Sequence, residues 1–239
     1  MALPTPKVPT YKTTLPQSGK VVTYRTFLVK ESKIIQLAMT SDDIGEIVQA
    51  MRQVVRLCTM DSVDVDKLSM VDLNWLMIKI RTVSKGSNVD LAMKCKNKLE
   101  DRVCGYVNEI SVSLDDLVVS GEIPDNNIPL YDDVGIVMTP PSLDLMTILN
   151  KNESESESIM KIVIGSIDYI YEGDQIYTSS DVTQEEVVEF LDSLTPEQLE
   201  PLLLYIKNQP KLSITVDYKC GGCGIEHKIE VDNITDFLD

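Results

Sequence analysis

The residues best suited to chemistry in this 239-residue chain are its cysteines. Cys220 and Cys223 form a Cys-x-x-Cys pair within "SITVDYKCGGCGIEHKIEV", and the single histidine, His227, follows four residues later. Such a pair acts in thiol–disulfide exchange when a helix N-terminus just beyond the first cysteine lowers the pKa of its thiol. Here residues 225–231 alternate between apolar and polar types, which predicts a strand and argues against redox catalysis.

The same pair is typical of a metal-binding knuckle, in which glycines let the backbone turn so that two sulfurs point at one ion. Tetrahedral zinc needs four ligands, and Cys95 and Cys104 can supply the other two, with His227 as an alternative ligand. The eight residues between Cys95 and Cys104 exceed the usual knuckle spacing of about two to four. Two interpretations therefore stay open: one structural zinc, or two hairpins with reduced cysteines and no cofactor.

An internal repeat predicts that the two cysteine pairs occupy equivalent positions. The segment "LSMVDLNWLMIKIR…NVDLAMKC" aligns with "LTPEQLEPLLLYIK…SITVDYKC", so that a capped helix leads into a strand and a cysteine in both. Beyond each loop, the Cys-Gly pairs at 104–105 and 223–224 precede strands with the same spacing of Ile and Val. The repeated unit is a helix, a strand, a cysteine loop and a second strand.

Helices and β-hairpins are therefore the elements that must position the cysteines, and the expected fold class is α+β. Alternation on both sides of "PQSG" predicts an N-terminal extended arm, a β-hairpin, over residues 1–28. A first unit of helices and a hairpin would span residues 29–141. A second unit, with the Cys-x-x-Cys hairpin, would span residues 142–239.

Several helix boundaries can be read from capping residues. Ser69 and Asp72 occupy the positions of a capping box at the start of a helix ending at Gly86. In the second unit we expect a helix from Ser142, a solvated loop over "NKNESESES", a helical segment "SIMKIVIGSIDYIY", and capped helices at Thr183 and Thr195.

Composition excludes several function classes. The net charge of −16 and pI of about 4.4 argue against binding to nucleic acid or to an anionic membrane surface. No run approaches the roughly 20 apolar residues that span a bilayer, and the start of the chain lacks the apolar core of a signal peptide. One histidine without a nucleophile partner, and no phosphate-binding glycine loop, indicate that the chain is not an enzyme.

Three segments resemble the baseplate hub assembly proteins of T-even-type contractile-tailed bacteriophages. They are "LPQSGKVVTYRTFLVKESKIIQLAM", "DLNWLMIKIRTVSKG", and "NEISVSLDDLVV" followed by "IPLYDDVGIVMTPPS". The resemblance runs over much of residues 10–150 and more weakly to the C-terminal knuckle. It implies late expression in the host cytoplasm, work there or in the virion baseplate, partners among other tail and hub proteins, and no catalytic residues.

Two functions follow from these observations. The first is a non-enzymatic assembly factor, chaperone-like or structural, that binds other baseplate hub proteins through its acidic surface, its Met-rich helices or an exposed strand edge of the arm. The second is a zinc-ribbon-like regulatory or interaction protein, which would hold one zinc ion tightly and lose its fold on chelation.

Overall fold

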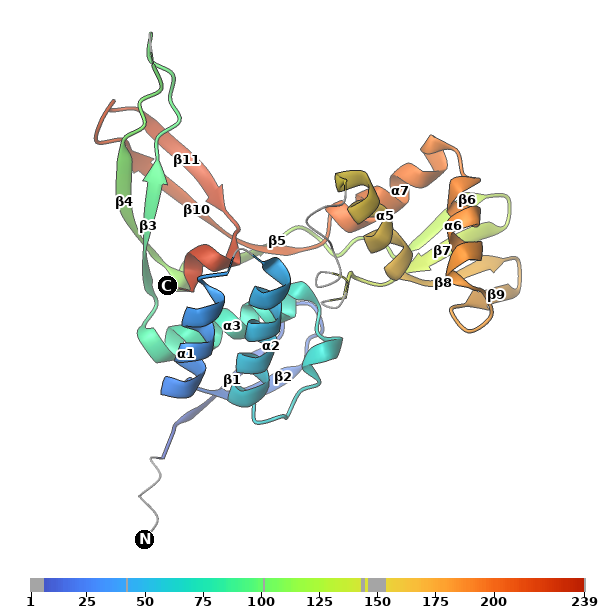
Figure 1. Ribbon diagram of the computed structural model, residues 1–239, viewed down its shortest axis with the longest axis horizontal. Helices are drawn as coiled ribbons and strands as arrows, with labels where there is room; N and C mark the ends of the chain where they lie inside the picture. Colours follow the sequence, from blue (N-terminus) through green and yellow to red (C-terminus); the bar gives the residue numbers. More distant parts are fainter. Residues whose placement is uncertain (1–6, 42, 101, 143–144, 146–153, 239) are drawn as a thin grey trace.

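Helices and antiparallel sheets are both present in the computed structural model, which describes residues 7–41, 43–100, 102–142, 145 and 154–238 (Figure 1). The expected α+β class is confirmed. The helices are α1 (Val29–Ala38), α2 (Ile44–Cys58), α3 (Met70–Lys85), α5 (Glu155–Gly165), α6 (Gln184–Asp192) and α7 (Pro196–Lys207), with short 3-10 turns η1 (Val65–Lys67), η2 (Leu114–Asp116) and η3 (Ile234–Phe237).

The strands form four antiparallel sheets in the described part of the chain. The strands are β1 (Thr10–Thr14), β2 (Val21–Arg25), β3 (Asn88–Lys94), β4 (Val107–Ser113), β5 (Val118–Ser120), β6 (Asn127–Tyr131), β7 (Val134–Met138), β8 (Ile167–Glu172), β9 (Gln175–Thr178), β10 (Lys211–Lys219) and β11 (Glu226–Val231). They pair as β1-β2, β3-β4, β11-β10-β5 and β6-β7-β8-β9.

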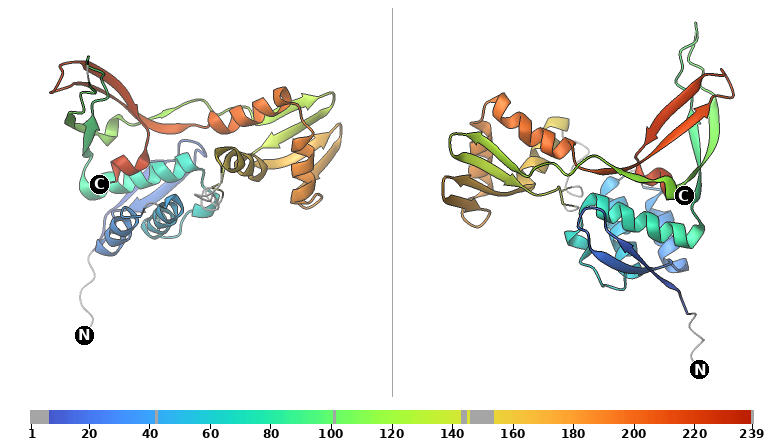
Figure 2. Two further views of the ribbon diagram at one scale, coloured as in Figure 1. Left: turned by 45° about the horizontal axis from the view of Figure 1, so that its top comes forward. Right: turned by 180° about the vertical axis from the view of Figure 1, so that it is seen from behind.

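The predicted N-terminal hairpin is present as β1 and β2, but it is part of a folded core. Leu15, Val22 and Tyr24 are buried in one hydrophobic cluster with residues of α1, α2 and α3. The indole N–H of Trp75 on α3 also donates to the Thr13 hydroxyl over 2.9 Å. Seen from behind, the hairpin crosses α3 (Figure 2). Removing residues 1–28 would therefore expose the helical core.

The capping role expected for Asp72 is wrong. Ser69 does cap α3, since its hydroxyl accepts from the N–H of Asp72 over 3.3 Å. The buried Asp72 carboxylate instead accepts the backbone N–H groups of Gln17 and Ser18 over 2.8 and 3.1 Å. Two donors in the β1–β2 turn, more than fifty residues away, outcompete the local cap because they would otherwise be left unpaired.

A buried ion pair also joins β2 to the helices. The guanidinium of Arg25 lies 3.0 Å from the carboxylate of Glu31, whose side chain is 0% exposed, and donates to the carbonyl of Leu57 at the end of α2. Glu31 also accepts from the backbone N–H of Leu28 at the start of α1. Burial disfavours the charge, but these hydrogen bonds outweigh it and hold the pKa of Glu31 below its usual value.

The two hairpins that carry the cysteine pairs pack face to face. Val89 and Leu91 of β3 share a buried cluster with Ile214 and Val216 of β10, and Ile78 of α3 closes the base of this cluster. The paired hairpins extend together away from the helices (Figure 1). Their tips are therefore held side by side, although more than a hundred residues separate them in sequence.

A third cluster lies in a separate lobe formed by β6–β9 with α5, α6 and α7 (Figure 2). The helical prediction for "SIMKIVIGSIDYIY" is half wrong, because α5 ends at Gly165 and β8 begins at Ile167. The predicted loop ends earlier than expected, since Ser154 and Glu157 form a capping box that starts α5. Most of the helix expected from Ser142, and the loop before Ser154, lie outside the described residues.

The boundaries expected after residues 28 and 141 stay predictions about folding units, but the hydrophobic clusters cross both of them. The two helices of the repeat, α3 and α7, lie in different parts of the molecule. Helix α3 lies beneath the paired hairpins, whereas α7 packs in the third lobe with Leu202 and Tyr205 buried there. Only the hairpins of the repeat therefore occupy equivalent positions, because each helix follows the core that covers its own apolar face.

Candidate metal centre

Four cysteines meet where the tips of the two hairpins face each other. The sulfurs of Cys95, Cys104, Cys220 and Cys223 all lie within 4.8 Å of one another. Cys95 Sγ is 3.7 Å from Cys223 Sγ, and Cys104 Sγ is 3.8 Å from Cys220 Sγ. Each contact joins the first cysteine of one hairpin to the second cysteine of the other, so exchanging the hairpins leaves the arrangement unchanged.

The backbone at the base of each cysteine loop is the same. In the first hairpin, the Cys95 N–H donates to the Tyr106 carbonyl over 2.8 Å, and the Gly105 N–H donates to the Cys95 carbonyl over 3.0 Å. In the second, the Cys220 N–H donates to the Ile225 carbonyl over 2.8 Å, and the Gly224 N–H donates back to Cys220 over 2.9 Å. Both loops are therefore knuckles of one kind, despite their different lengths.

The long spacing between Cys95 and Cys104, which the sequence presents as an obstacle, is absorbed by a protruding loop. The described residues between the two cysteines, 96–100 and 102–103, include an antiparallel β-bridge between Lys98 and Val103. The Cys104 N–H then donates to the Asn97 carbonyl over 2.8 Å, which brings Cys104 back to the knuckle. Extra residues at a hairpin tip lengthen the loop without moving its base.

The glycines of the knuckles have two different roles. Gly105 and Gly224, each directly after the second cysteine, have φ of +68° and +74°, a conformation that favours glycine. Gly221 and Gly222 do not need a positive φ; they make room for Tyr106 of the first hairpin. A Cβ on Gly222 would lie 2.7 Å from the Cβ of Tyr106, and one on Gly221 would lie 2.9 Å from its ring. Both glycines lie in the turn, as expected, and the space for Tyr106 is an additional requirement at these positions.

His227 lies next to the cysteine cluster and contacts one of its sulfurs, that of Cys95. It is paired with Tyr218 across the hairpin and stacks on its ring at 4.9 Å between centroids, and His227 Nε2 is 3.2 Å from Cys95 Sγ. Asn108 occupies the equivalent position in the first hairpin, and its Nδ2 is 3.8 Å from Cys220 Sγ. Each hairpin thus presents one polar side chain to the first cysteine of the other.

Asn108 is a residue that sequence reasoning missed. Its side chain is largely buried. Besides approaching the sulfur of Cys220, it accepts a hydrogen bond at Oδ1 from the backbone N–H of Gly221 over 2.9 Å. Its position three residues after Gly105, as His227 is three after Gly224, was the available signal. The alignment of the repeat places the two residues together, but an asparagine and a histidine do not attract attention as equivalents.

The four thiols do not ionise independently. Burial opposes ionisation of Cys220, but the N–H groups of Cys223 and Gly222 and the neighbouring thiols lower its pKa to about 6. The N–H of Asn97 favours the Cys95 thiolate, but burial and the three other cysteines outweigh it and raise the pKa of Cys95 to about 12. Sulfurs this close cannot all carry charge unless a cation lies among them.

The fifth cysteine is not part of the centre. Cys58 is fully buried on α2 within the helical core. Burial, with Arg25 opposing it, raises the pKa of this thiol to about 11. Cys58 therefore serves as a packing residue, as its place on an apolar helix face predicts.

The dimensions of the centre fit tetrahedral zinc. With zinc about 2.3 Å from each sulfur, the edges of a regular tetrahedron are about 3.8 Å, which matches both sulfur–sulfur contacts above. Four cysteine ligands leave no open position for a substrate or water, which is the pattern of a structural metal site. Fold and site together thus define a class of α+β protein in which paired hairpins are organised around a tetracysteine centre.

Comparison with known proteins identifies the family of the chain. The family model described as T4 bacteriophage base plate protein matches residues 8–239. The chain belongs to this family, so the resemblance found in residues 10–150 is confirmed and extends through the C-terminal knuckle. Searches of the curated proteins and of the solved structures found no significant match. Among the described residues, no helix is both long and apolar enough to cross a membrane.

Proposed function

We propose that this chain is a non-enzymatic factor in building the tail baseplate hub, and that one structural zinc ion at Cys95, Cys104, Cys220 and Cys223 fastens its two hairpins. The family match supports the place in the baseplate. The zinc proposal is supported by one observation: two cysteine pairs that are far apart in sequence meet with sulfur–sulfur distances that fit tetrahedral coordination. In this proposal the metal is a clamp, and the work of the protein is binding to other tail and hub proteins.

The side chains around the cysteines support a closed structural site. His227 can donate from Nε2 to the Cys95 thiolate, and Asn108 from Nδ2 to Cys220. Donors of this kind orient metal ligands and spread their negative charge. His227 would therefore act as a hydrogen-bond donor to a ligand rather than as the alternative ligand.

The two hairpins would gain stability from a metal ion that links their tips. The hairpins share one buried cluster and extend outward from the helices, with the four cysteines at their tips. A hairpin by itself is only marginally stable in water. Zinc binding would turn two such hairpins into one rigid projection, suited to meeting a partner during assembly in the host cytoplasm or to remaining in the virion baseplate.

Affinity purification of the tagged chain from phage-infected cells tests this proposal. We expect other tail or hub proteins to co-purify with the chain, and metal analysis to find about one zinc per chain. The variant Cys104→Ser/Cys220→Ser should lose the zinc, whereas Cys58→Ala should keep it. Recovery of no tail protein would refute the assembly role, and a chain without zinc would refute the clamp.

A zinc-ribbon-like regulatory or interaction protein is the second candidate, because the tetracysteine centre fits it equally well. Both candidates predict the same metal content. The identities of the co-purified proteins separate them: host or phage regulators would favour this candidate, and tail components would favour the first.

A further inference from the structure

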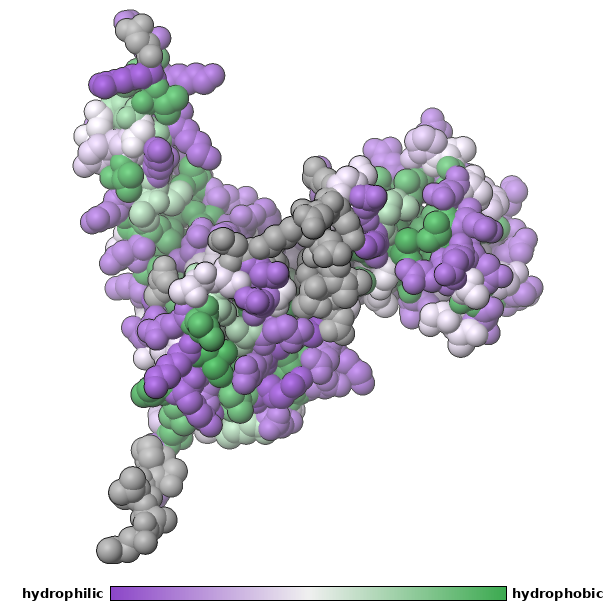
Figure 3. All heavy atoms as spheres, in the orientation of Figure 1, coloured by the Kyte–Doolittle hydropathy of each residue, from purple (hydrophilic) through white to green (hydrophobic). Residues whose placement is uncertain are grey.

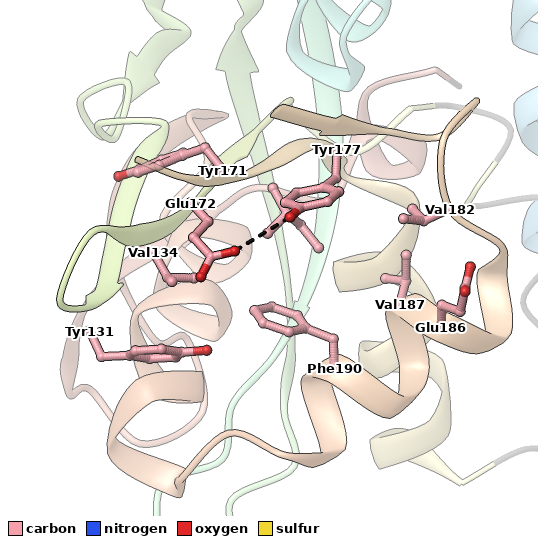
Figure 4. A pocket seen from close by; sticks show the side chains of 10 residues that line it. Tyr131, Val134, Tyr171, Glu172, Tyr177, Val182, Glu186, Val187 and Phe190 are labelled. Atoms are coloured by element: carbon pink, nitrogen blue, oxygen red, sulfur yellow. Dashed lines mark hydrogen bonds between the residues drawn. The ribbon is translucent and has the colours of Figure 1, made fainter. Parts of the chain in front are cut away.

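The third lobe contains a cavity of about 330 Å³ between the β8–β9 edge of its sheet and helix α6 (Figure 4). Its lining residues come from β6, β7, β8, β9, α6 and the loop between β9 and α6: Tyr131, Val134, Ile170, Tyr171, Glu172, Tyr177, Val182, Glu186, Val187 and Phe190. This volume is near the lower end of the range for ligand pockets, roughly 300–1,000 Å³. The cavity could hold a side chain or two but not a folded element.

The cavity combines aromatic walls with carboxylates. Tyr131, Tyr177 and Phe190 line it, and the Glu172 carboxylate points inward, where it accepts from the Tyr177 hydroxyl over 3.4 Å (Figure 4). Burial, followed by the charge of Glu172, raises the pKa of Tyr177. Glu186 lies at the rim and accepts the N–H of Thr183 at the start of α6.

These carboxylates have no cation of their own in the described part of the chain. Neither Glu172 nor Glu186 forms an ion pair there, and no lysine or arginine is among the residues that line the cavity. Neither carboxylate is therefore neutralised by a direct ion pair among the described residues. A partner that supplied a cation would gain an interaction that the folded chain leaves unmade.

The charge of the whole lobe points in the same direction. Residues 121–210 contain 18 Asp or Glu and three Lys, whereas the rest of the chain contains 20 Asp or Glu and 19 Lys or Arg. Nearly all of the net charge of −16 thus belongs to this stretch of the sequence, which contains the elements of the third lobe. On the face shown in Figure 3, hydrophilic side chains cover most of the lobe and surround a small hydrophobic patch. Such a surface attracts basic partners and repels anionic ones.

We propose that this cavity is a docking site for an arginine side chain presented by a basic segment of a partner protein. Aromatic faces attract a guanidinium or ammonium group, and a carboxylate beside them completes the recognition of a cation. Arginine suits the cavity best, since its planar group stacks on a ring while donating to Glu172. The inference rests on the proposed function only in that the partner is a tail protein; the chemistry of the cavity stands independently.

The test uses the full-length chain as purified and a defined probe. The probe is the peptide acetyl-Gly-Lys-Arg-Lys-Gly-amide, and its control contains citrulline, which has the shape of arginine without the charge. Binding is followed by titration calorimetry and by NMR shifts of backbone amides in ¹⁵N-labelled protein. We expect shifts concentrated at Glu172, Tyr177 and Phe190, and binding by the arginine peptide about fivefold tighter than by the citrulline peptide at low salt.

Two variants separate the cavity from the general acidity of the lobe. Glu172→Gln removes a charge from the lining of the cavity, and Glu200→Gln removes the same charge from α7, outside the lining; both residues are exposed. We expect about fivefold weaker binding for Glu172→Gln and less than about twofold weaker binding for Glu200→Gln. Thermal unfolding of both variants checks that the lobe is intact.

Three outcomes would overturn the proposal. Equal losses in the two variants would mean that the peptide senses only the diffuse charge of the lobe. Shifts confined to other surfaces would place the basic-segment site elsewhere, and shifts at the cavity that depend on protein concentration without peptide would assign it to a second copy of the chain. None of these results would alter the co-purification of tail proteins, so failure here and failure of the proposed function are distinguishable.

Discussion

Removal of the proposed zinc should destabilise the chain by an amount that follows from the length of chain that the metal closes. Cys104 and Cys220, whose sulfurs are 3.8 Å apart, are separated by 116 residues. A cross-link that closes a loop of this length reduces the entropy of the unfolded chain by an equivalent of about 5 kcal/mol at 25 °C. For a chain of this size, that corresponds to a fall in Tm of about 10–20 °C.

The assay is thermal unfolding followed by circular dichroism and calorimetry, with zinc content measured on the same samples. The zinc-loaded chain, the chain treated with chelator and the variant Cys104→Ser/Cys220→Ser are compared. We expect the last two to unfold at the same reduced temperature, since both lack the cross-link. The variant Cys58→Ala is the matched control, because Cys58 lies in the helical core and not at the centre.

Thiol labelling gives an independent readout of the same perturbation. With zinc bound, the four cysteines of the centre should react slowly; after chelation they should all react, while Cys58 should stay protected until the chain unfolds. The reasoning is refuted if chelation shifts the Tm by less than about 2 °C, because the clamp would then contribute less than about 1 kcal/mol. It is also refuted if Cys58→Ala loses the zinc.

The remaining predictions concern packing and charge. Gly222→Ala should lower the free energy of unfolding by about 1–3 kcal/mol, because its Cβ would overlap a tyrosine Cβ, whereas Gly221→Ala meets only a movable ring and should cost less. Asp72→Asn should cost about 2 kcal/mol through lost hydrogen bonds to the β1–β2 turn, against less than about 0.5 kcal/mol for the exposed Asp90→Asn. Glu31→Gln should lower the free energy of unfolding by about 3 kcal/mol at pH 7, because it breaks the buried ion pair with Arg25. Denaturant titrations measure the free energy of unfolding of each variant.

The Glu31 prediction has a definite pH dependence. The folded-state pKa of Glu31 is lowered from 4.5, so its ion pair contributes fully above that value and is lost as pH falls through the lowered pKa. The difference between wild type and Glu31→Gln should therefore shrink in acid; a constant difference from pH 7 to pH 3 would contradict it. The Gly222 prediction would be contradicted by a Gly222→Ala variant as stable as wild type. The Asp72 prediction would be contradicted if Asp72→Asn and Asp90→Asn lowered the free energy of unfolding equally.

Much of the local structure could be predicted from sequence because it depends on neighbouring residues. The caps at Ser69, Thr183 and Thr195 are present as expected, since each hydroxyl accepts from an N–H three residues along the same segment. The glycine after the second cysteine of each knuckle is likewise a local requirement of the backbone. The prediction of helix or strand was wrong where two short apolar patterns are adjacent. At Ile167, for example, strand β8 begins directly after α5.

Long-range partners could not be predicted, because nothing near them in the chain indicates them. Asp72 had a local role available but takes donors from a turn more than fifty residues earlier. Gly221 and Gly222 are glycines because of a tyrosine in the other hairpin, which no local pattern reveals. The cavity beside Glu172 likewise exists only because β8, β9 and α6 meet at one edge of the third lobe.

The sequence by itself determined the fold class, the repeated hairpin with its cysteines, the acidic charge and the resemblance to baseplate proteins. Only the tertiary structure decided that Cys95 and Cys104 lie against Cys220 and Cys223, and that the loop between the first two does not prevent it. The physical reason is the range of the forces involved. Capping and turn formation act over a few residues, whereas the meeting of two hairpins depends on the apolar faces they bury together.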